Sequence, residues 1–313
     1  MFNRKYFRGL MVGSMLIGSI MVGAMPEVEA APAIEQSELE SAAHKREEGN
    51  ALYLQGDYDG AIACYDEALE INPKYALAYY HRGDAYTALK QYDRAVADYT
   101  KGLEYSPNDA DAYYSRGNAY YRLEDYRSAV ADYDRAVELE PKFENAYYNR
   151  GNARKNLDDY QGAIEDFTKA IKLNEKFAAA YYNRGNAYGV LKDYRKAIAD
   201  YDKALKLSPD LTVAYINRGL AYYYLKDVSR AIADYTKAIE FEPNNAVVYF
   251  GRGLSYAELG EYMLAKEDCD RALEINPDLA EAYIVRAVCH KNLGETEKMR
   301  EDMATAKRLN GDA

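Results

Sequence analysis

Arginine and aspartate recur in this chain at a fixed spacing, and together they can form a buried ion pair. The arginines, each 34 residues after the last, are Arg82, Arg116, Arg150, Arg184, Arg218, Arg252 and Arg286. The aspartates, each sixteen residues after its arginine, are Asp98, Asp132, Asp166, Asp200, Asp234, Asp268 and Asp302. A planar guanidinium can hold a carboxylate through two N–H groups, so this spacing suits a paired structural contact.

The segment before the first arginine shows which residues should pair. It has Glu48 where arginine is expected and Cys64 where aspartate is expected, so the two residue types are absent together. Pairing between successive segments would instead match Arg82 with Cys64 and leave Asp302 alone. We therefore expect an ion pair within each segment and interpret the arginines as structural rather than catalytic.

No other group of residues suggests catalysis. The histidines His44, His81 and His290 are scattered, and the sequence has no HExxH, no GxSxG and no phosphate-binding loop. We expect no enzyme activity, no metal site and no cofactor.

The elements that position these residues form a repeat. Gly49, Gly83, Gly117, Gly151, Gly185, Gly219 and Gly253 are each 34 residues apart, and Ala287 takes the next place. Eight units of 34 residues therefore start at residues 42, 76, 110, 144, 178, 212, 246 and 280, and the last ends at Ala313. Self-similarity with this period predicts a helical solenoid.

Each unit has the pattern of two helices. In the unit from residue 178, Tyr181, Gly185 and Tyr188 share one helical face, and a similar spacing recurs around Tyr201. Asp193 is suited to cap the second helix, and a proline at residue 209 follows its end. One such unit cannot cover its own apolar face, so neighbouring units must stack into an all-α array.

The pattern resembles the tetratricopeptide repeat family over residues 42–313. Counted within a unit, it has a small residue at position 8, an aromatic at 11 and 24, alanine at 20 and 27, and proline at 32. Departures include Leu52 and Arg154 at position 11, Glu175 at position 32 and Cys269 at position 24. The resemblance implies a right-handed superhelix with a concave groove that binds peptides.

Carried over by position, the resemblance places this groove on the first helix of each unit. Its tyrosines are Tyr80, Tyr114, Tyr148 and Tyr182, and its amides are Asn118, Asn149, Asn152, Asn183, Asn186 and Asn217. Its apolar end contains Ile216, Leu220, Phe250 and Leu254. The amides could contact a partner's backbone, or they could solvate the groove while the tyrosines pack it. The apolar end could hold a ligand, or it could be covered by neighbouring units or by another copy of the chain.

The first 30 residues resemble a signal peptide. Arg4, Lys5 and Arg8 precede a short apolar run, and Val28-Glu29-Ala30 places cleavage after Ala30. We expect residues 31–41 to be a mobile tail and the mature chain to be exported by a bacterium, to the periplasm or outside the cell. The alternative is an uncleaved segment that anchors the chain to a membrane.

Charge and cysteine content limit the choice of partners. The formal net charge is −11, and removing three basic and two acidic residues with the leader makes it −12. This argues against binding nucleic acid or anionic lipid through bulk charge. The three cysteines, Cys64, Cys269 and Cys289, are too few for a disulfide framework, and we interpret them as small buried residues. Cys269 and Cys289 are the two that one bridge could join.

We therefore expect an exported, non-enzymatic scaffold that binds a protein or peptide partner in the groove. One alternative is self-assembly as a homodimer through the outer face of the eighth unit. Another is an accessory subunit of an envelope enzyme or a secretion complex. The sequence does not identify the partner.

Overall fold

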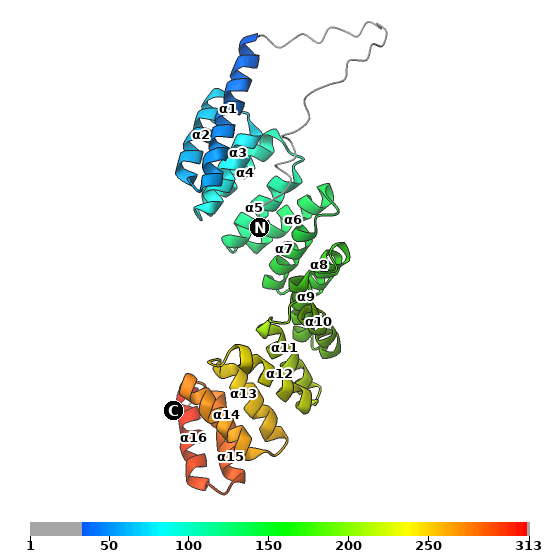
Figure 1. The fold of residues 1–313 in the computed structure, drawn as a ribbon, viewed down its shortest axis with the longest axis vertical. Helices are drawn as coiled ribbons and strands as arrows, with labels where there is room; N and C mark the ends of the chain where they lie inside the picture. The colour runs from blue at the N-terminus through cyan, green and yellow to red at the C-terminus, as the bar shows by residue number, and fades with distance from the viewer. Residues whose placement is uncertain (1–32, 312–313) are drawn as a thin grey trace.

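The computed structural model describes residues 33–311, which form helices α1 to α16 in sequence order. The first helices of the units are α1 (Ala33–Gln55), α3 (Ala76–Ala88), α5 (Ala110–Arg122), α7 (Glu144–Asn156), α9 (Ala178–Val190), α11 (Thr212–Tyr224), α13 (Ala246–Glu258) and α15 (Ala280–Asn292). The second helices are α2 (Tyr58–Ile71), α4 (Tyr92–Tyr105), α6 (Tyr126–Leu139), α8 (Tyr160–Leu173), α10 (Tyr194–Leu207), α12 (Val228–Phe241), α14 (Tyr262–Ile275) and α16 (Thr296–Leu309). Figure 1 shows the pairs stacked from α1 at one end to α16 at the other, which confirms the predicted all-α solenoid.

A tight turn joins the two helices of a unit. In the unit from residue 178, Lys192 adopts a left-handed φ of 63°, and the Asp193 N–H donates to the Tyr188 carbonyl at 2.9 Å. The Asp193 carboxylate then accepts the Lys196 N–H at 3.3 Å, which confirms the predicted cap of α10. The left-handed residue closes the first helix, and the cap begins the second.

Close contact between the two helices of a unit depends on the glycine at position 8. A Cβ atom added to Gly185 would lie 2.8 Å from Cε1 of Tyr201, which is 3% exposed. Alanines at positions 20 and 27, here Ala197 and Ala204, are fully buried, and Ala197 packs in the same cluster as this ring. The small residues therefore make room for the aromatic residue at position 24.

The segment expected as a tail, residues 31–41, is helical from Ala33 onward, because α1 begins there and continues into the first unit. Residues 36–41 are exposed, so packing against the array does not explain their helical state. The segment contains alanine, glutamate, glutamine and leucine, with no proline or glycine after Pro32, and these residues favour helix. The predicted leader, residues 1–30, lies outside the described residues.

Each repeated arginine binds the aspartate of its own unit through two N–H groups. Arg218 donates from Nε to Asp234 Oδ2 at 2.8 Å and from Nη2 to Asp234 Oδ1 at 2.6 Å. The same two-bond contact occurs in all seven units that contain the pair. The seven aspartates are at most 6% exposed, so these are buried ion pairs that join the two helices of each unit.

The third arm of each arginine reaches the preceding unit, a contact that the sequence analysis missed. Arg218 Nη1 donates to Asp202 Oδ1 on α10 at 2.5 Å, while Arg184 Nη1 donates to Thr168 Oγ1 on α8 at 2.9 Å. The acceptors alternate strictly along the chain: Asp66, Thr100, Asp134, Thr168, Asp202, Thr236 and Asp270. One guanidinium therefore ties three helices from two units.

The fourth unit shows how a departure from the repeat is accommodated. Arg154 occupies the usual aromatic position, and its Nη1 lies 3.0 Å from Asp166 Oδ2, so Asp166 forms ion pairs with both Arg150 and Arg154. Burial still raises the pKa of Asp166, and both arginines oppose that rise. The extra cation therefore lies beside a carboxylate whose ionised form is costly to bury.

We predict that Arg184→Leu destabilises the array by about 3–5 kcal/mol, because Asp200 would become a buried carboxylate without its partner. The double variant Arg184→Leu with Asp200→Leu should recover most of the loss. Thr168→Val, which leaves the ion pair intact but removes the contact between units and the Thr168 bond to the Ile164 carbonyl, should cost about 1 kcal/mol. Urea denaturation followed by circular dichroism measures all three, and an unchanged midpoint for Arg184→Leu would contradict the buried ion pair.

Candidate functional site

The predicted groove residues lie along the first helices, where a hydrogen-bonded network links successive units. Asn149 on α7 donates from Nδ2 to Tyr114 Oη at 3.1 Å and to Asn118 Oδ1 at 2.8 Å, both on α5. The Tyr133 hydroxyl on α6 donates to the same Asn118 oxygen at 2.8 Å. These amides therefore hold the third and fourth units together.

The network recurs two units later. Asn217 donates to Tyr182 Oη at 3.2 Å and to Asn186 Oδ1 at 2.9 Å, and Tyr201 donates to Asn186 Oδ1 at 2.8 Å. The sequence analysis missed the tyrosine hydroxyls at position 24 as partners of these amides. The recurring Tyr–Asn separation of fifteen residues was the available signal.

Between these two networks, the equivalent hydrogen bonds that would join the fourth and fifth units are incomplete. Position 24 of the fourth unit is Phe167, which has no hydroxyl, and the Asn152 side chain makes no hydrogen bond within residues 33–311. Asn183 still donates to Tyr148 Oη at 2.9 Å, but its Oδ1 accepts from Lys155 Nζ at 3.2 Å. Burial lowers the pKa of Lys155, and no carboxylate of the described chain lies within 4 Å of its ammonium group.

The network leaves particular atoms able to meet a partner. Asn149 and Asn217 use their Nδ2 groups internally, while their Oδ1 atoms accept no hydrogen bond from the described residues. Asn152 lies between them with both its amide donor and its acceptor unused. Internal bonds therefore hold the Oδ1 atoms of Asn149 and Asn217 in place before any partner arrives.

The placement of Tyr80 in the groove is wrong. Its side chain is 1% exposed, belongs to a core cluster, and donates from its hydroxyl to the Ser106 carbonyl at 3.0 Å. The following second helix has Gly102 where other units have alanine, and a Cβ there would lie 2.3 Å from the Tyr80 ring. This missing methyl group lets Tyr80 sink into the core, while Tyr114, Tyr148 and Tyr182 remain half-buried.

The predicted apolar end is only partly exposed. Leu220 on α11 is 43% exposed. Ile284 and Val288, two units further on α15, are 38% and 45% exposed. Phe250 and Leu254 are half-buried and pack against a core cluster that contains Cys269 and Cys289. Ile216 is also half-buried and packs against the core around Tyr235. Neighbouring units thus cover part of this surface, one of the two outcomes that the sequence left open.

At the other end, charged or titratable residues replace the amides. Asp84 stands where the third unit has Asn118, and it accepts the Tyr99 hydroxyl at 2.7 Å. Burial raises the pKa of Asp84 to about 6, and Asp111 and Asp109 add to the rise. His81, which stands where the fourth unit has Asn149, bonds to Asn50, and burial with Arg46 lowers its pKa to about 4.

The cysteines and His290 lie among residues of the packed array. Cys269 and Cys289 are buried free thiols in one cluster, while Cys64 is a half-buried free thiol. His290 is buried and its Nδ1 bonds to Glu295. Across residues 33–311, no group of three or more histidine, cysteine or acidic residues could hold a metal ion. No helix in that range is long and apolar enough to span a membrane.

Comparison with family models identifies the repeat. Models described as "TPR repeat" match residues 49–89 and 83–124. A model described as "Tetratricopeptide repeat" matches residues 110–143, 144–177, 178–211, 212–245 and 246–279, in the register of units three to seven. These matches together cover more than half of the 313 residues. No curated protein matches the chain.

Several solved structures have the same architecture. YrrB, titled "a TPR protein with an unusual peptide-binding site", is 26% identical with a TM-score of 0.54, covering 59% of this chain and 95% of YrrB. MamA is 30% identical with a TM-score of 0.53, covering 55% of this chain and 93% of MamA. The C-terminal part of a TPR repeat-containing protein from Cytophaga hutchinsonii has a TM-score of 0.64 at 20% identity, covering 75% and 96%, and shows the fold alone.

We predict that Asp84→Asn stabilises the array at pH 7 by about 1–2 kcal/mol, because a partly buried carboxylate without a cation becomes an amide. The folded-state pKa of Asp84, about 6, lies above its unfolded value. Acidification below pH 6 therefore protonates the folded native chain first and stabilises it, so the variant's advantage should shrink towards pH 4. Urea midpoints at both pH values measure this.

Asn118→Asp, at the equivalent position of the next unit, is the reciprocal control and should destabilise the array at pH 7. An advantage of Asp84→Asn that is equally large at both pH values would contradict the raised pKa.

Proposed function

The chain belongs to the tetratricopeptide repeat family, and from this we propose that it is an exported, non-enzymatic scaffold that binds an extended polypeptide along its first helices. Proteins of this family bind protein or peptide partners. The observation that carries the proposal is the set of polar atoms on α7 to α11, of which those of Asn149 and Asn217 are fixed by internal hydrogen bonds. It runs from Asn149 through Asn152 and Lys155 to Asn217.

These atoms suit a polypeptide backbone. The Oδ1 atoms of Asn149 and Asn217 can each accept a backbone N–H, and the Asn152 amide can both donate and accept. The half-buried tyrosines Tyr114 and Tyr148 lie beside them, and their hydroxyls already hold asparagine side chains in place. Little side-chain ordering would remain to be done on binding, which favours affinity.

Two further features support a polypeptide partner. The exposed Leu220, Ile284 and Val288 offer apolar contacts for the end of the same segment beyond α11. YrrB, a structural neighbour at 26% identity, is described in its title as having a peptide-binding site. In every unit that contains the pair, the arginine is bound to its aspartate, which favours a structural role over a catalytic one for these arginines.

The test is affinity capture from the native cell envelope with the mature chain and with Asn152→Ala. Asn152 makes no side-chain hydrogen bond in the described chain, so its loss should leave the stability within about 0.5 kcal/mol of the native value. We expect a partner retained by the native chain to be weakened several-fold on the variant. Asn244→Ala, at an exposed turn, is the matched control.

Equal capture of every partner by the native chain and by Asn152→Ala would place recognition outside the first helices. Export is tested separately, by the intact mass of the chain recovered from the envelope fraction. We expect a mature chain that begins at Ala31, and an intact leader would favour the anchored form.

A further inference from the structure

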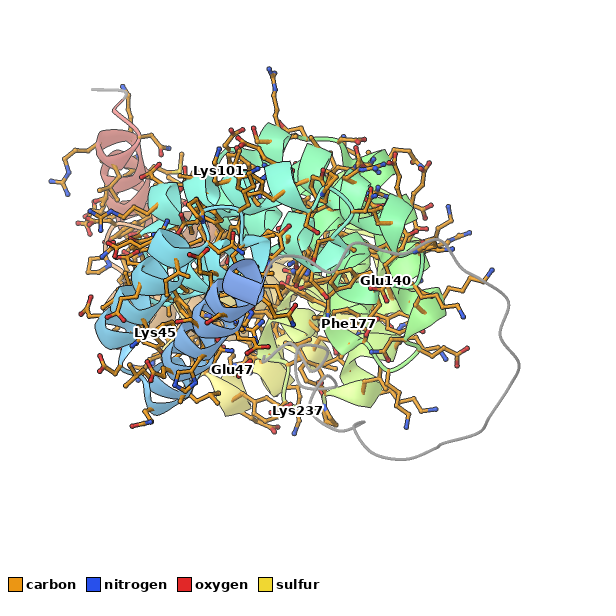
Figure 2. All side chains as sticks on the ribbon, turned by 90° about the horizontal axis from the view of Figure 1, so that it is seen from above. Lys45, Glu47, Lys101, Glu140, Phe177 and Lys237 are labelled. Atoms are coloured by element: carbon orange, nitrogen blue, oxygen red, sulfur yellow. The ribbon has the colours of Figure 1, made fainter. Side chains whose placement is uncertain are left out.

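The second helices have a repeated surface pair at positions 26 and 29, one helical turn apart. In four units this pair is a salt bridge: Lys101–Glu104, Arg135–Glu138, Lys237–Glu240 and Arg271–Glu274, with N–O distances of 2.5–2.9 Å. Figure 2 shows Lys101 and Lys237 at the periphery of the solenoid, seen from above. In these four of the eight units the surface is therefore locally neutral.

The fourth and fifth units break this pattern. Their pairs are Lys169 with Lys172 on α8, and Lys203 with Lys206 on α10, and all four lysines are exposed. Across residues 33–311, no carboxylate lies within 4 Å of any of them, and Glu165, one turn before Lys169, forms no ion pair with it. Because α8 and α10 both pack against α9, the four lysines lie on neighbouring units.

Lys169 lies over the Tyr147 ring, 5.7 Å from its centroid, but a group of four lysines without a carboxylate partner is unexpected in a chain with a formal net charge of −11. Like charges one turn apart on a helix repel, and a glutamate at position 29 would remove the repulsion, as it does in four other units. We propose that these four lysines form a second interaction surface that binds an acidic polypeptide segment. The surface lies on the second helices and is separate from the polar atoms of the first helices.

A short acidic segment fits this surface better than an extended polyanion does. The patch spans two units. At the same two positions the first unit has Glu67 and Glu70, so this row of second helices is acidic at its N-terminal end. The field of a net negative chain repels nucleic acid or an anionic membrane that extends beyond the lysines. Contacts between exposed charges are weak and are screened by salt, so binding should be modest and salt-dependent.

The test uses Lys172→Glu with Lys206→Glu, which restores the Lys–x–x–Glu pair of the other units and should leave the fold intact. The probe is a fluorescein-labelled peptide of about ten glutamates, followed by fluorescence anisotropy at low and at physiological salt. We expect the native chain to bind, more weakly as salt rises, and the variant to bind about tenfold more weakly or worse.

The control is Lys101→Glu with Lys237→Glu, which makes the same change in net charge on the same row of second helices, at position 26 of the second and sixth units. This control should bind the probe within about twofold of the native chain once the long-range field is screened. An equal loss in both variants would mean that net charge, and not the patch, controls binding. Absence of binding by the native chain at low salt would also overturn the proposal.

Phosphatidylserine vesicles and a short DNA duplex complete the comparison. We expect both to bind the native chain more weakly than the acidic peptide does. Stronger binding of either, lost in Lys172→Glu with Lys206→Glu, would assign the surface to a membrane or to nucleic acid and overturn the acidic-polypeptide assignment. Circular dichroism of every variant separates a binding defect from a folding defect.

Discussion

The structure depends on a guanidinium group that two successive units share. Two N–H groups of each arginine hold the aspartate of its own unit, and a third reaches aspartate or threonine on the preceding second helix. Burying these charges is costly, and burial raises the pKa of Asp98, Asp132 and Asp234 despite their arginines. Apolar residues could therefore pack as stably, and the shared guanidinium adds a fixed geometry within a unit and between successive units.

A second set of contacts crosses the same unit boundaries on the first helices, and it varies along the array. It is complete between Asn118 and Asn149 and between Asn186 and Asn217, and it is open at Asn152, where Phe167 replaces tyrosine. The arginine contacts continue through all of these boundaries. The scaffold is thus uniform where it carries stability and variable where a partner could bind, an arrangement that repeat proteins permit because each unit contacts only its neighbours.

The period of 34 residues was enough to predict the helices, the solenoid and the pairing of arginine with aspartate within a unit. That pairing was visible because both residues are missing from the first unit. The third arginine contact was hidden because its acceptor alternates between aspartate and threonine, two residue types that look like solvated surface. The groove amides were ambiguous for a related reason, since asparagine bonds equally well to a partner or to a neighbouring tyrosine. The burial of Tyr80 depends on one methyl group absent from Gly102, a detail of packing that no periodic pattern contains.

The claim that each arginine couples two successive units is tested most directly by hydrogen exchange. Exchange is measured by mass spectrometry on the native chain and on Arg218→Leu. Arg218 binds Asp234 on α12 and Asp202 on α10, so removing its side chain should weaken two units at once. We predict faster amide exchange in both α9–α10 and α11–α12, with α3 to α6 unchanged because distant units contact only their own neighbours. Faster exchange confined to α11–α12, or no change in either unit, would contradict the claim that the arginine couples successive units.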